Sequence, residues 1–336
     1  DIDSKLTGTQ QFTVWRSGRG IFTNGFGANN PDTDPKTRFK SENEPEYVVE
    51  NGVLNGAAEA EQWCYDNALN WSYFCAQSAS KSGADKKQYM VLYSDWVAET
   101  NSSYTTAFGT DSYYSYGGLY VPGNVEIELD LKGFTINRAL SSSTARNYGW
   151  IARIDGKLTI TDSSTNDAGV LTNAGRLINA WNSYSSTTYG GGISVTSGGE
   201  LTVLGGRIYN NRGYYGGVSV YGNGKLNLGG NAQIYNNYTI SGTTRNIYLH
   251  NTTAKSINVI SQFTGTALSY GQKFGITRLG NGTFTNGFET YHPDETAETY
   301  FASEDANFFV FTDDATGKKE AGLISYNANT NWEYAI

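Results

Sequence analysis

The sequence predicts an all-β fold, and within that class a right-handed parallel β-helix whose rungs of about 25 residues each hold three short strands. Three observations lead to this prediction: a motif that returns every 25 or 26 residues, strands too short to be stable alone, and a longer repeat that relates the two ends of the chain. An amphipathic helix before the first rung is expected to cover the N-terminal end of the stack.

The short period is clearest in the second half of the chain. Segment 190–211 (GGISVTSGGELTVLGGRIYNN from residue 191) is followed by 216–237 (GGVSVYGNGKLNLGGNAQIYNN) and by 245–260 (RNIYLHNTTAKSINVI). Upstream, 119–136 and 150–162 show the same order of short alternating strands. The matched apolar positions are Ile193 and Val195 with Val218 and Val220, Leu201 and Val203 with Leu226 and Leu228, and Ile208 with Ile234.

Stacking explains how such short strands become stable. A strand of three to five residues buries too little surface to persist alone, whereas a strand that pairs with its equivalent one rung on, about 4.8 Å away, places like side chains on like. Asn210 and Asn211 recur as Asn236 and Asn237, so ladders of side-chain amides are expected, with turn formation as the simpler interpretation. The right-handed sense follows from the preference of parallel crossover connections.

A longer repeat relates the two ends of the chain. Residues 10–42 match residues 272–304, and from 10 to 52 the identity is 17 of 43 positions at a constant offset of 262 residues. This pattern predicts the tail of one unit followed by a whole second unit, as in a tandem array. The expected division is a β segment at 1–53, a capping helix at 54–88, the β-helix at 89–271 and a C-terminal β segment at 272–336.

The predicted helix covers about 57–80. Its apolar residues recur at spacings of three and four, and the stripe is expected to lie across the first rung, near a strand at 89–96. Cys64 and Cys75 fall on this helix, and eleven residues of helix separate their sulfur atoms by roughly 16 Å, which excludes a disulfide. Both are therefore predicted to be core thiols.

The strings IELDLKGFTI, GKLTITDSS, GGGISVTSGGELTVLGGRIYNN and RNIYLHNTTAKSINVISQFTGT resemble the β-helical repeat segments of adhesin-like surface proteins of gut Firmicutes and related microbes, which share the pectin-lyase-like β-helix. The resemblance covers roughly residues 90–304. It implies an extracellular location at the bacterial cell surface. Charge agrees with part of this expectation: a net charge of -8 disfavours binding to nucleic acid or to an anionic bilayer, and no apolar run is long enough to insert into a membrane.

Catalysis is the alternative to a structural role. Enzymes on this fold use carboxylates on neighbouring rungs, and rung alignment places Asp130 level with Thr161 and Asp162. Asp130 and Asp162 are therefore the acid pair expected of a polysaccharide lyase or glycoside hydrolase, with Asp155 as a third candidate. Aspartate in such turns commonly accepts backbone N–H bonds, so the sequence favours a protein that is not an enzyme.

Tyrosine is the residue type that best suits recognition. Rigid aromatic rings on a flat sheet stack on sugar faces or fill protein pockets, although tyrosine also decorates exposed β faces for cross-strand packing. The two histidines, His250 and His292, lie outside any metal or triad spacing and are expected to have no functional partners. The candidate ligand-binding residues are Tyr113, Tyr114, Tyr116, Tyr214 and Tyr215.

No cofactor or resident metal is predicted, although acidic residues recur in both copies of the long repeat and leave calcium open. These residues are Asp32, Asp34, Glu42 and Glu44, and Asp294, Glu295, Glu304 and Asp305. The sequence thus predicts a structural or adhesive surface module that spaces or presents binding surfaces, and that could assemble end to end into filaments. Its expected partners are neighbouring copies or modules of the same protein and host or cell-wall glycans or proteins, with a non-catalytic carbohydrate-binding module as a further alternative.

Overall fold

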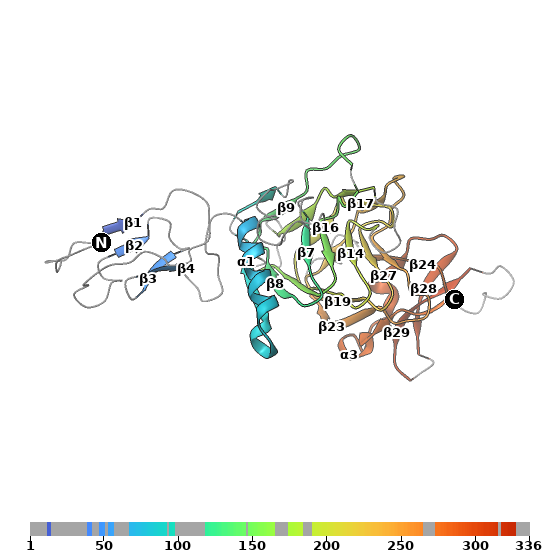
Figure 1. Cartoon of the computed structure of the whole chain (residues 1–336). Coiled ribbons are helices and arrows are strands. Elements are labelled where there is room, and N and C mark those ends of the chain that lie inside the picture. The colour runs from blue at the N-terminus through green and yellow to red at the C-terminus, as the bar shows by residue number, and fades with distance from the viewer. Residues whose placement is uncertain are drawn as a thin grey trace.

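The structure is a computed structural model in which most of the chain after residue 66 is described. The described ranges are 67–92, 94–97, 118–145, 147–164, 174–183, 190–264, 273–314 and 317–326, without the side chains of 68–70 and 72, together with the backbone of four strands at 12–14, 39–41, 47–50 and 53–56. Most of the strands lie in parallel sheets, and helices are few, as Figure 1 shows. The predicted all-β class with parallel pairing is therefore confirmed.

Three parallel sheets of seven, seven and five strands contain most of the strands. The first sheet contains β7 (Leu119–Val121), β10 (Ala152–Ile154), β14 (Ile193–Val195), β18 (Val218–Val220), β22 (Ile247–Leu249), β24 (Phe274–Arg278) and β27 (Phe301–Ser303). The second contains β5 (Lys87–Val91), β8 (Glu126–Asp130), β11 (Lys157–Thr161), β15 (Glu200–Val203), β19 (Lys225–Gly230), β23 (Ile257–Phe263) and β26 (Thr285–Asn286). The third contains β6 (Trp96–Val97), β9 (Thr135–Asn137), β12 (Arg176–Ile178), β16 (Arg207–Tyr209) and β20 (Gln233–Ile234).

The chain visits these sheets in a fixed order, for example β7, β8 and β9, then β10, β11 and β12. We call a segment that gives one strand to each sheet in turn a rung. In later rungs a short strand precedes the return to the first sheet, and these strands form a small parallel sheet of β13 (Trp181–Asn182), β17 (Arg212–Gly213) and β21 (Tyr238–Thr239). The first two sheets therefore collect strands from successive rungs along the whole stack, whereas the third sheet ends at β20.

The register between rungs agrees with the predicted matches. Ile193 pairs with Val218, Leu201 with Leu226 and Ile208 with Ile234, each across a parallel strand pair. All six of these side chains are at most 2% exposed, because alternate residues of each strand point into the space between the sheets. Each buried Leu or Ile contributes roughly 1.5–3 kcal/mol through removal of apolar surface from water, so the ladders of like residues form the core.

The paired asparagines have two different roles. The first of each pair, Asn210 or Asn236, has a positive φ (54° and 49°) and turns the chain. The second is fully buried: Asn211 donates from its backbone and side-chain nitrogens to Oδ1 of Asn237, at 3.1 and 3.2 Å. Asn237 donates in the same way to Oδ1 of Asn246, at 2.9 and 3.2 Å. The predicted amide ladder and the predicted turn are therefore both present, on adjacent residues.

Helix α1 (Asn67–Ser80) packs against β5 and β8 at the N-terminal end of the sheets (Figure 1). Trp71, Phe74 and Cys75 are at most 3% exposed, and burial raises the pKa of the Cys75 thiol well above its usual range. Cys75 is a core thiol as predicted, whereas Cys64 and the expected helical residues 57–66 lie outside the described residues. The single strand expected at 89–96 is wrong: β5 and β6 replace it, and they belong to different sheets.

The C-terminal end of the sheets carries an antiparallel element. Strands β25 (Gly282–Thr283), β28 (Phe308–Asp313) and β29 (Glu320–Ser325) form a three-stranded antiparallel sheet beside the short helices α3 (Phe288–Tyr291) and η5 (Ala297–Thr299). At the opposite end, the 3-10 helix η2 (Gly83–Lys86) links α1 to β5.

Four further strands lie in the first 56 residues. Strands β1 (Phe12–Val14) and β2 (Phe39–Ser41) pair in parallel, and β3 (Tyr47–Glu50) and β4 (Val53–Gly56) form an antiparallel pair. Strand β4 crosses the expected boundary between a β segment at 1–53 and a helical segment at 54–88.

Candidate functional site

The carboxylates predicted as a catalytic pair are held by backbone groups. Asp130 pairs with Thr161 across β8 and β11, which places it in the rung next to Asp162 as the alignment predicted. Oδ1 of Asp130 accepts the backbone N–H groups of Lys132 (2.9 Å) and Ser163 (2.8 Å). The bond from Lys132 closes the turn after β8, the role that aspartate commonly has in turns, and the bond from Ser163 joins this turn to the next rung.

Asp162 is held even more tightly. It is 7% exposed, its Oδ1 accepts the N–H of Gly133 at 2.9 Å, and its Oδ2 accepts the N–H of Gly175 at 2.5 Å. The hydroxyl of Ser164 donates to the same Oδ1 at 2.7 Å. The pair therefore joins consecutive turns, and this geometry gives no support to a reaction at these carboxylates.

Asp155, the third candidate, joins three rungs. Its carboxylate accepts the hydroxyl of Tyr120 (2.9 Å) and the hydroxyl of Thr196 (2.7 Å), and it forms an ion pair with Arg153 (2.7 Å). Because Arg153 is only 7% exposed, the ion pair is largely shielded from water. These contacts fasten β7, β10 and the turn after β14 together.

Two of the predicted tyrosines take part in an aromatic cluster, which we call the Tyr215 cluster. It comprises Tyr214, Tyr215, Tyr221, Arg245, Tyr248 and His250. The ring of Tyr215 lies 5.1 Å from Tyr214, 4.9 Å from Tyr248 and 4.5 Å from His250, measured between ring centroids. Tyr221 lies 5.4 Å from His250, and the guanidinium carbon of Arg245 lies 5.1 Å from the centre of Tyr248. Tyr113, Tyr114 and Tyr116 lie outside the described residues.

The parallel register assembles this cluster. Tyr248 is the middle residue of β22, so its side chain points away from the core when Ile247 and Leu249 point inward, and it pairs with Ser219 of β18. Tyr214 and Tyr215 lie between β17 and β18, while His250 directly follows β22. Sequence analysis missed Tyr248 and His250 because a single aromatic residue in a short strand gives no pattern; the rung alignment could have placed Tyr248 beside Ser219.

The environment of the cluster is apolar and carries one cation. Burial, and then the charge of Arg245, lowers the pKa of His250 to about 4, so its imidazole is neutral at neutral pH. Burial also raises the pKa values of Tyr215 and Tyr248. Within the described part of the chain, Nε2 of His250 and Nε of Arg245 have no hydrogen-bond partner. Tyr214 is 42% exposed, so the cluster offers one accessible ring, whereas these two nitrogen atoms are buried beneath the surface.

His292 has hydrogen-bond partners, and they belong to a structural contact. It is 2% exposed at the end of α3, its Nδ1 lies 2.6 Å from Oε2 of Glu295, and its Nε2 accepts the N–H of Phe263 at 3.3 Å. The hydroxyl of Tyr300 donates to the same Glu295 oxygen at 2.7 Å, and these bonds lower the pKa of Glu295. The group lies among stacked aromatic rings of the C-terminal end and has a structural role. The sequence did not reveal this contact, because His292 and Glu295 lie outside any repeating pattern of residues.

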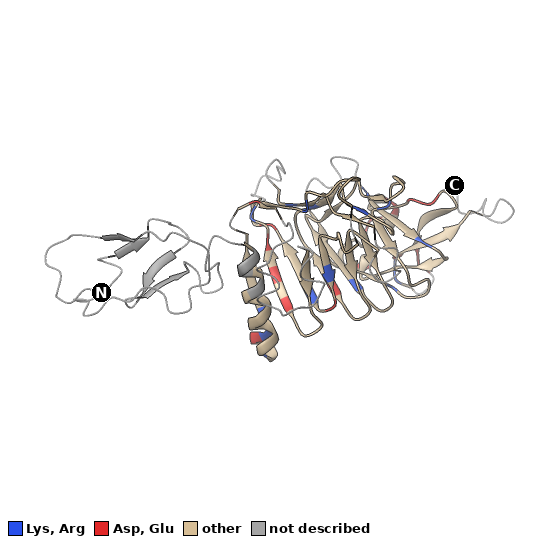
Figure 2. Ribbon diagram, turned by 45° about the horizontal axis from the view of Figure 1, so that its top comes forward, with Lys and Arg blue, Asp and Glu red and all other residues tan. Residues whose placement is uncertain are grey.

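The outer face of the second sheet carries a row of alternating charge (Figure 2). Lys87, Glu126, Lys157, Glu200 and Lys225 follow one another in register across five strands. Lys87 lies 2.6 Å from Glu128, and Lys157 lies 3.6 Å from Glu126. Cross-strand pairing within the sheet accounts for this alternation, and exposed pairs of this kind contribute little to stability.

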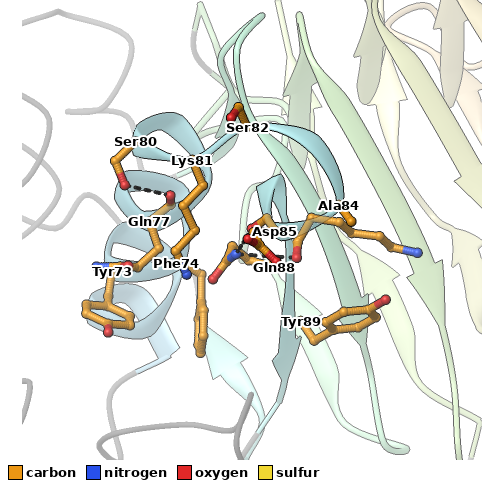
Figure 3. Close-up of a pocket in the computed structure, with 11 residues that line it drawn as sticks. Tyr73, Phe74, Gln77, Ser80, Lys81, Ser82, Ala84, Asp85, Gln88 and Tyr89 are labelled. Atoms are coloured by element: carbon orange, nitrogen blue, oxygen red, sulfur yellow. Dashed lines mark hydrogen bonds between the residues drawn. The ribbon is translucent and has the colours of Figure 1, made fainter.

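A groove of about 790 Å³ lies between α1 and β5, and its residues are drawn in Figure 3. The walls combine aromatic rings with amide, hydroxyl and charged groups, and Tyr89 is 46% exposed beside Lys87, whose Nζ is 5.2 Å from the ring centre. The side-chain amide of Gln88 is already bonded to the carbonyl of Asp85 at 2.7 Å. The groove is lined by Tyr73, Phe74, Gln77, Ser80, Lys81, Ser82, Ala84, Asp85, Lys87, Gln88 and Tyr89.

Of the acidic residues considered for calcium, Glu295, Glu304 and Asp305 have separate partners. Glu304 accepts both nitrogens of Asn246, at 2.7 and 2.6 Å, while Asp305 accepts both nitrogens of Asn307 at 2.9 Å. Among the described residues, no group of three or more His, Cys, Asp or Glu side chains is arranged to hold a metal ion. Asp32, Asp34, Glu42 and Glu44 lie outside the described residues.

No protein-family model, curated protein or solved structure matches this chain. In the ranges that the structure describes, no helix is both long and apolar enough to cross a membrane.

Proposed function

We propose that this chain is a structural and adhesive module of an extracellular, tandemly repeated bacterial surface protein, built on a right-handed parallel β-helix. One observation carries the proposal: the strand pairing at the C-terminal end recurs, residue for residue, near the N-terminus. Phe12 and Val14 of β1 pair with Phe39 and Ser41 of β2, and Phe274 and Ile276 of β24 pair with Phe301 and Ser303 of β27. Each residue and its counterpart are 262 positions apart.

A second stretch of sequence supports the tandem arrangement. Residues 56–75 and 317–336 are identical at 7 of 20 positions at an offset of 261 residues, including Asn70, Trp71 and Tyr73 of α1 and their counterparts Asn331, Trp332 and Tyr334. The repeat thus extends from the C-terminal strands into the next helix. A module that ends where its successor begins is typical of a solenoid array, in which each unit contacts its neighbours.

The order in which the chain visits the sheets supports the proposed β-helix. Parallel strands need a crossover connection, and from β5 to β22 each crossover passes through the other two sheets before returning beside its starting strand. Connections between parallel strands are right-handed in nearly all proteins. Buried ladders and the Asn211 to Asn246 amide ladder tie each rung to the next, which favours a stiff element suited to spacing or presenting a surface.

Adhesion is assigned to the Tyr215 cluster. An exposed ring at Tyr214 beside the cation of Arg245 suits a flat ligand with polar groups at its edge, such as a sugar ring. Glycans are therefore the proposed ligand class, and the role of the cluster is binding without catalysis.

A glycan array tests the adhesive part. We expect the wild-type chain to bind a subset of glycans, and Tyr214→Ala and Tyr215→Ala to weaken that binding at least tenfold, because stacking is lost. Tyr89→Ala is the matched control, since Tyr89 is similarly exposed on a different sheet. New reducing ends or unsaturated sugars during incubation would instead indicate an enzyme and sink the proposal of a non-catalytic adhesin.

Sedimentation and small-angle scattering test the structural part. We expect an elongated particle, and if the first 52 residues mediate end-to-end association, their deletion is expected to abolish it. Unchanged assembly after deletion would refute association through this segment.

A further inference from the structure

Two tyrosine rings stack on adjacent rungs at the C-terminal edge of the third sheet. Tyr209 is the last residue of β16, and Tyr235 directly follows β20. Ile208 pairs with Ile234 across these parallel strands, so the two tyrosines are the next residues in register. Their ring centroids are 5.3 Å apart, and the ring planes differ by only 7°. Because parallel strands in register place like side chains opposite one another, corresponding edges of the two phenol rings lie side by side.

The backbone on both sides of this pair is fixed. The N–H of Tyr235 donates to the carbonyl of Ile208 at 3.2 Å, and the N–H of Asn210 donates to the carbonyl of Asn236 at 3.0 Å. The isoleucines that precede the tyrosines are at most 2% exposed and anchor the two strands in the core. Both tyrosine rings are half-buried, so solvent reaches one side of the stack. The fold therefore holds two phenols together where a dissolved oxidant has access.

The pair is set apart from other tyrosines of the third sheet. On the side away from Tyr235, Tyr209 lies opposite Ile178 of β12, whose aliphatic side chain has no phenol. Strand β20 is the last described strand of the sheet, so no further strand of this sheet follows Tyr235. Within the described strands of the sheet, each of these tyrosines thus has the other as its tyrosine neighbour in register.

Other easily oxidised side chains are less suited to react. Cys75 and Met90 are fully buried, and Met90 is the only methionine of the chain. Tyr215 and Tyr248 lie 4.9 Å apart, but their rings are tilted by 35°. Burial raises the pKa of both phenols, which opposes the loss of the phenolic proton during oxidation. The geometry therefore favours oxidation chemistry at the Tyr209–Tyr235 stack.

We propose that Tyr209 and Tyr235 form an oxidative cross-linking site, at which a carbon–carbon bond joins two rungs as dityrosine. The oxidant is hydrogen peroxide acting through a haem peroxidase. Each phenol gives up one electron and one proton and becomes a phenoxyl radical. The two radicals join through ring carbons ortho to oxygen, and the hydrogen on each of these carbons moves to the oxygen as a proton, which restores both phenols. Hydrogen peroxide takes up the two electrons and two protons and becomes two molecules of water.

The bond has a mechanical consequence for the stack. It closes a loop of chain between residues 209 and 235 and holds β16 to β20 independently of their hydrogen bonds. A cross-link of this kind restricts the unfolded chain, as a disulfide does, and so opposes the separation of adjacent rungs. The site thus provides a means of stiffening the sheet after folding, and this role is separate from any binding at the Tyr215 cluster.

Peptide mapping of the full chain tests the proposal directly. The protein is treated with a haem peroxidase and limiting hydrogen peroxide and is then digested with trypsin. Digestion releases residues 208–212, in which Tyr209 is the only tyrosine, and residues 226–245, which contain Tyr235 and Tyr238. We expect these two peptides to be linked, with the loss of two hydrogen atoms. This pair is expected to be about tenfold more abundant than any other tyrosine-linked pair, because the fold brings the reacting rings together.

Three variants locate the link. Tyr209→Phe and Tyr235→Phe each keep a stacked ring but lack one phenol, so each is expected to abolish the linked pair. Tyr238→Phe is the matched control, because Tyr238 lies in the same peptide as Tyr235 while its ring contacts the guanidinium of Arg212 at 4.9 Å. We expect Tyr238→Phe to leave the link unchanged. The cross-linked wild type is also expected to unfold at a higher urea concentration than peroxidase-treated Tyr235→Phe.

Two further measurements decide whether the folded stack is responsible. In a mixture of ¹⁵N-labelled and unlabelled chains, we expect both halves of the linked pair to carry the same label, since the bond forms within one chain. In urea-unfolded protein, the preference for this pair is expected to disappear. If the linked halves carry mixed labels, if the pair forms equally well in urea, or if residues 208–212 link equally to many tyrosine peptides, the stack is not a cross-linking site and the inference is wrong.

Discussion

At the scale of single residues, the direction of the amide ladder explains why a carboxylate ends it. Asn211 donates toward Asn237, and Asn237 donates toward Asn246. The last side chain of the ladder needs only to accept hydrogen bonds. An asparagine at this place would carry side-chain N–H groups with no acceptor in a further rung. Glu304 meets this need, and Gly275 leaves room for it, since a Cβ on Gly275 would lie 2.2 Å from the Glu304 carboxylate.

Glu304→Gln is predicted to change the pH dependence of stability. Burial, opposed by the bonds from Asn246, raises the pKa of Glu304 to about 7 from 4.5, so the folded state holds this proton more tightly than the unfolded state. The resulting stabilisation is full below pH 4.5 and is lost as the pH rises through 7, by on the order of 3 kcal/mol. Between pH 5 and 8 the urea midpoint of the wild type is expected to fall, whereas that of Glu304→Gln is expected to lack this fall. If the midpoints of both proteins fall equally, the pKa of Glu304 is not raised in the folded state.

His250→Phe is predicted to reduce the loss of stability at acidic pH. Folding lowers the pKa of His250 from 6.5 to about 4, so its contribution to stability is present above pH 6.5 and is lost as the pH falls through 4. The loss is about 1–3 kcal/mol, reduced by partial solvent exposure. Phenylalanine keeps the ring contacts with Tyr215 and Tyr248 and does not titrate. Both proteins also carry Glu304→Gln, which removes the titration of that carboxyl. In this background, the urea midpoints at pH 7.5 and 4.5 are expected to differ less with His250→Phe than with His250 retained.

At the scale of secondary structure, α1 is fastened to backbone groups of β7 and β8 by side-chain contacts. The hydroxyl of Ser78 accepts the N–H of Glu126 at 2.7 Å and donates to its carbonyl at 3.2 Å, at the first residue of β8. Cys75 contacts the carbonyl oxygen of Tyr120 in β7, the first strand of the first sheet, with the sulfur 4.0 Å away. An amphipathic helix predicts burial of one face, but these edge contacts depend on where the strands begin.

Ser78→Ala is predicted to destabilise the fold by roughly 1–3 kcal/mol, because it leaves buried backbone groups of Glu126 without this partner. Ser80→Ala, two residues along the same helix, is the matched control, since Ser80 is exposed and bonds only to Gln77 within the described contacts. Its effect is expected to stay within about 0.5 kcal/mol. Denaturant unfolding measures both, and equal effects would show that Ser78 does not fasten α1 to β8.

At the scale of the whole molecule, the described sheets form a chain of nearest-neighbour contacts between rungs. Strands β11, β15 and β19 have a paired strand on each side, while β5 and β27 have one. Hydrogen exchange followed by mass spectrometry is predicted to show the slowest amides in β11, β15 and β19 and faster exchange in β5 and β27, because end rungs open with fewer contacts to break. Uniform protection across all these strands would indicate a single cooperative unit.

The candidate site was only partly accessible to prediction. The sequence singled out Tyr214 and Tyr215 because they are adjacent and follow a turn, but Tyr248 and His250 come from another rung and join them through parallel pairing. Asp130 and Asp162 were placed in neighbouring rungs correctly, whereas the backbone N–H groups that occupy their oxygens depend on turn conformations that residue types alone leave open.

By itself, the sequence determined the rung period, the register of the buried apolar ladders and the sequence repeat that relates the two ends of the chain. These features repeat at fixed spacing, and a strand that pairs with its own equivalent must inherit that spacing. Only the tertiary structure decided that the segment at 89–96 divides between two sheets, that His292 is buried against Glu295, and that the Tyr215 cluster exists. Those features join residues with no common period, so they depend on how the rungs stack and how the ends are covered.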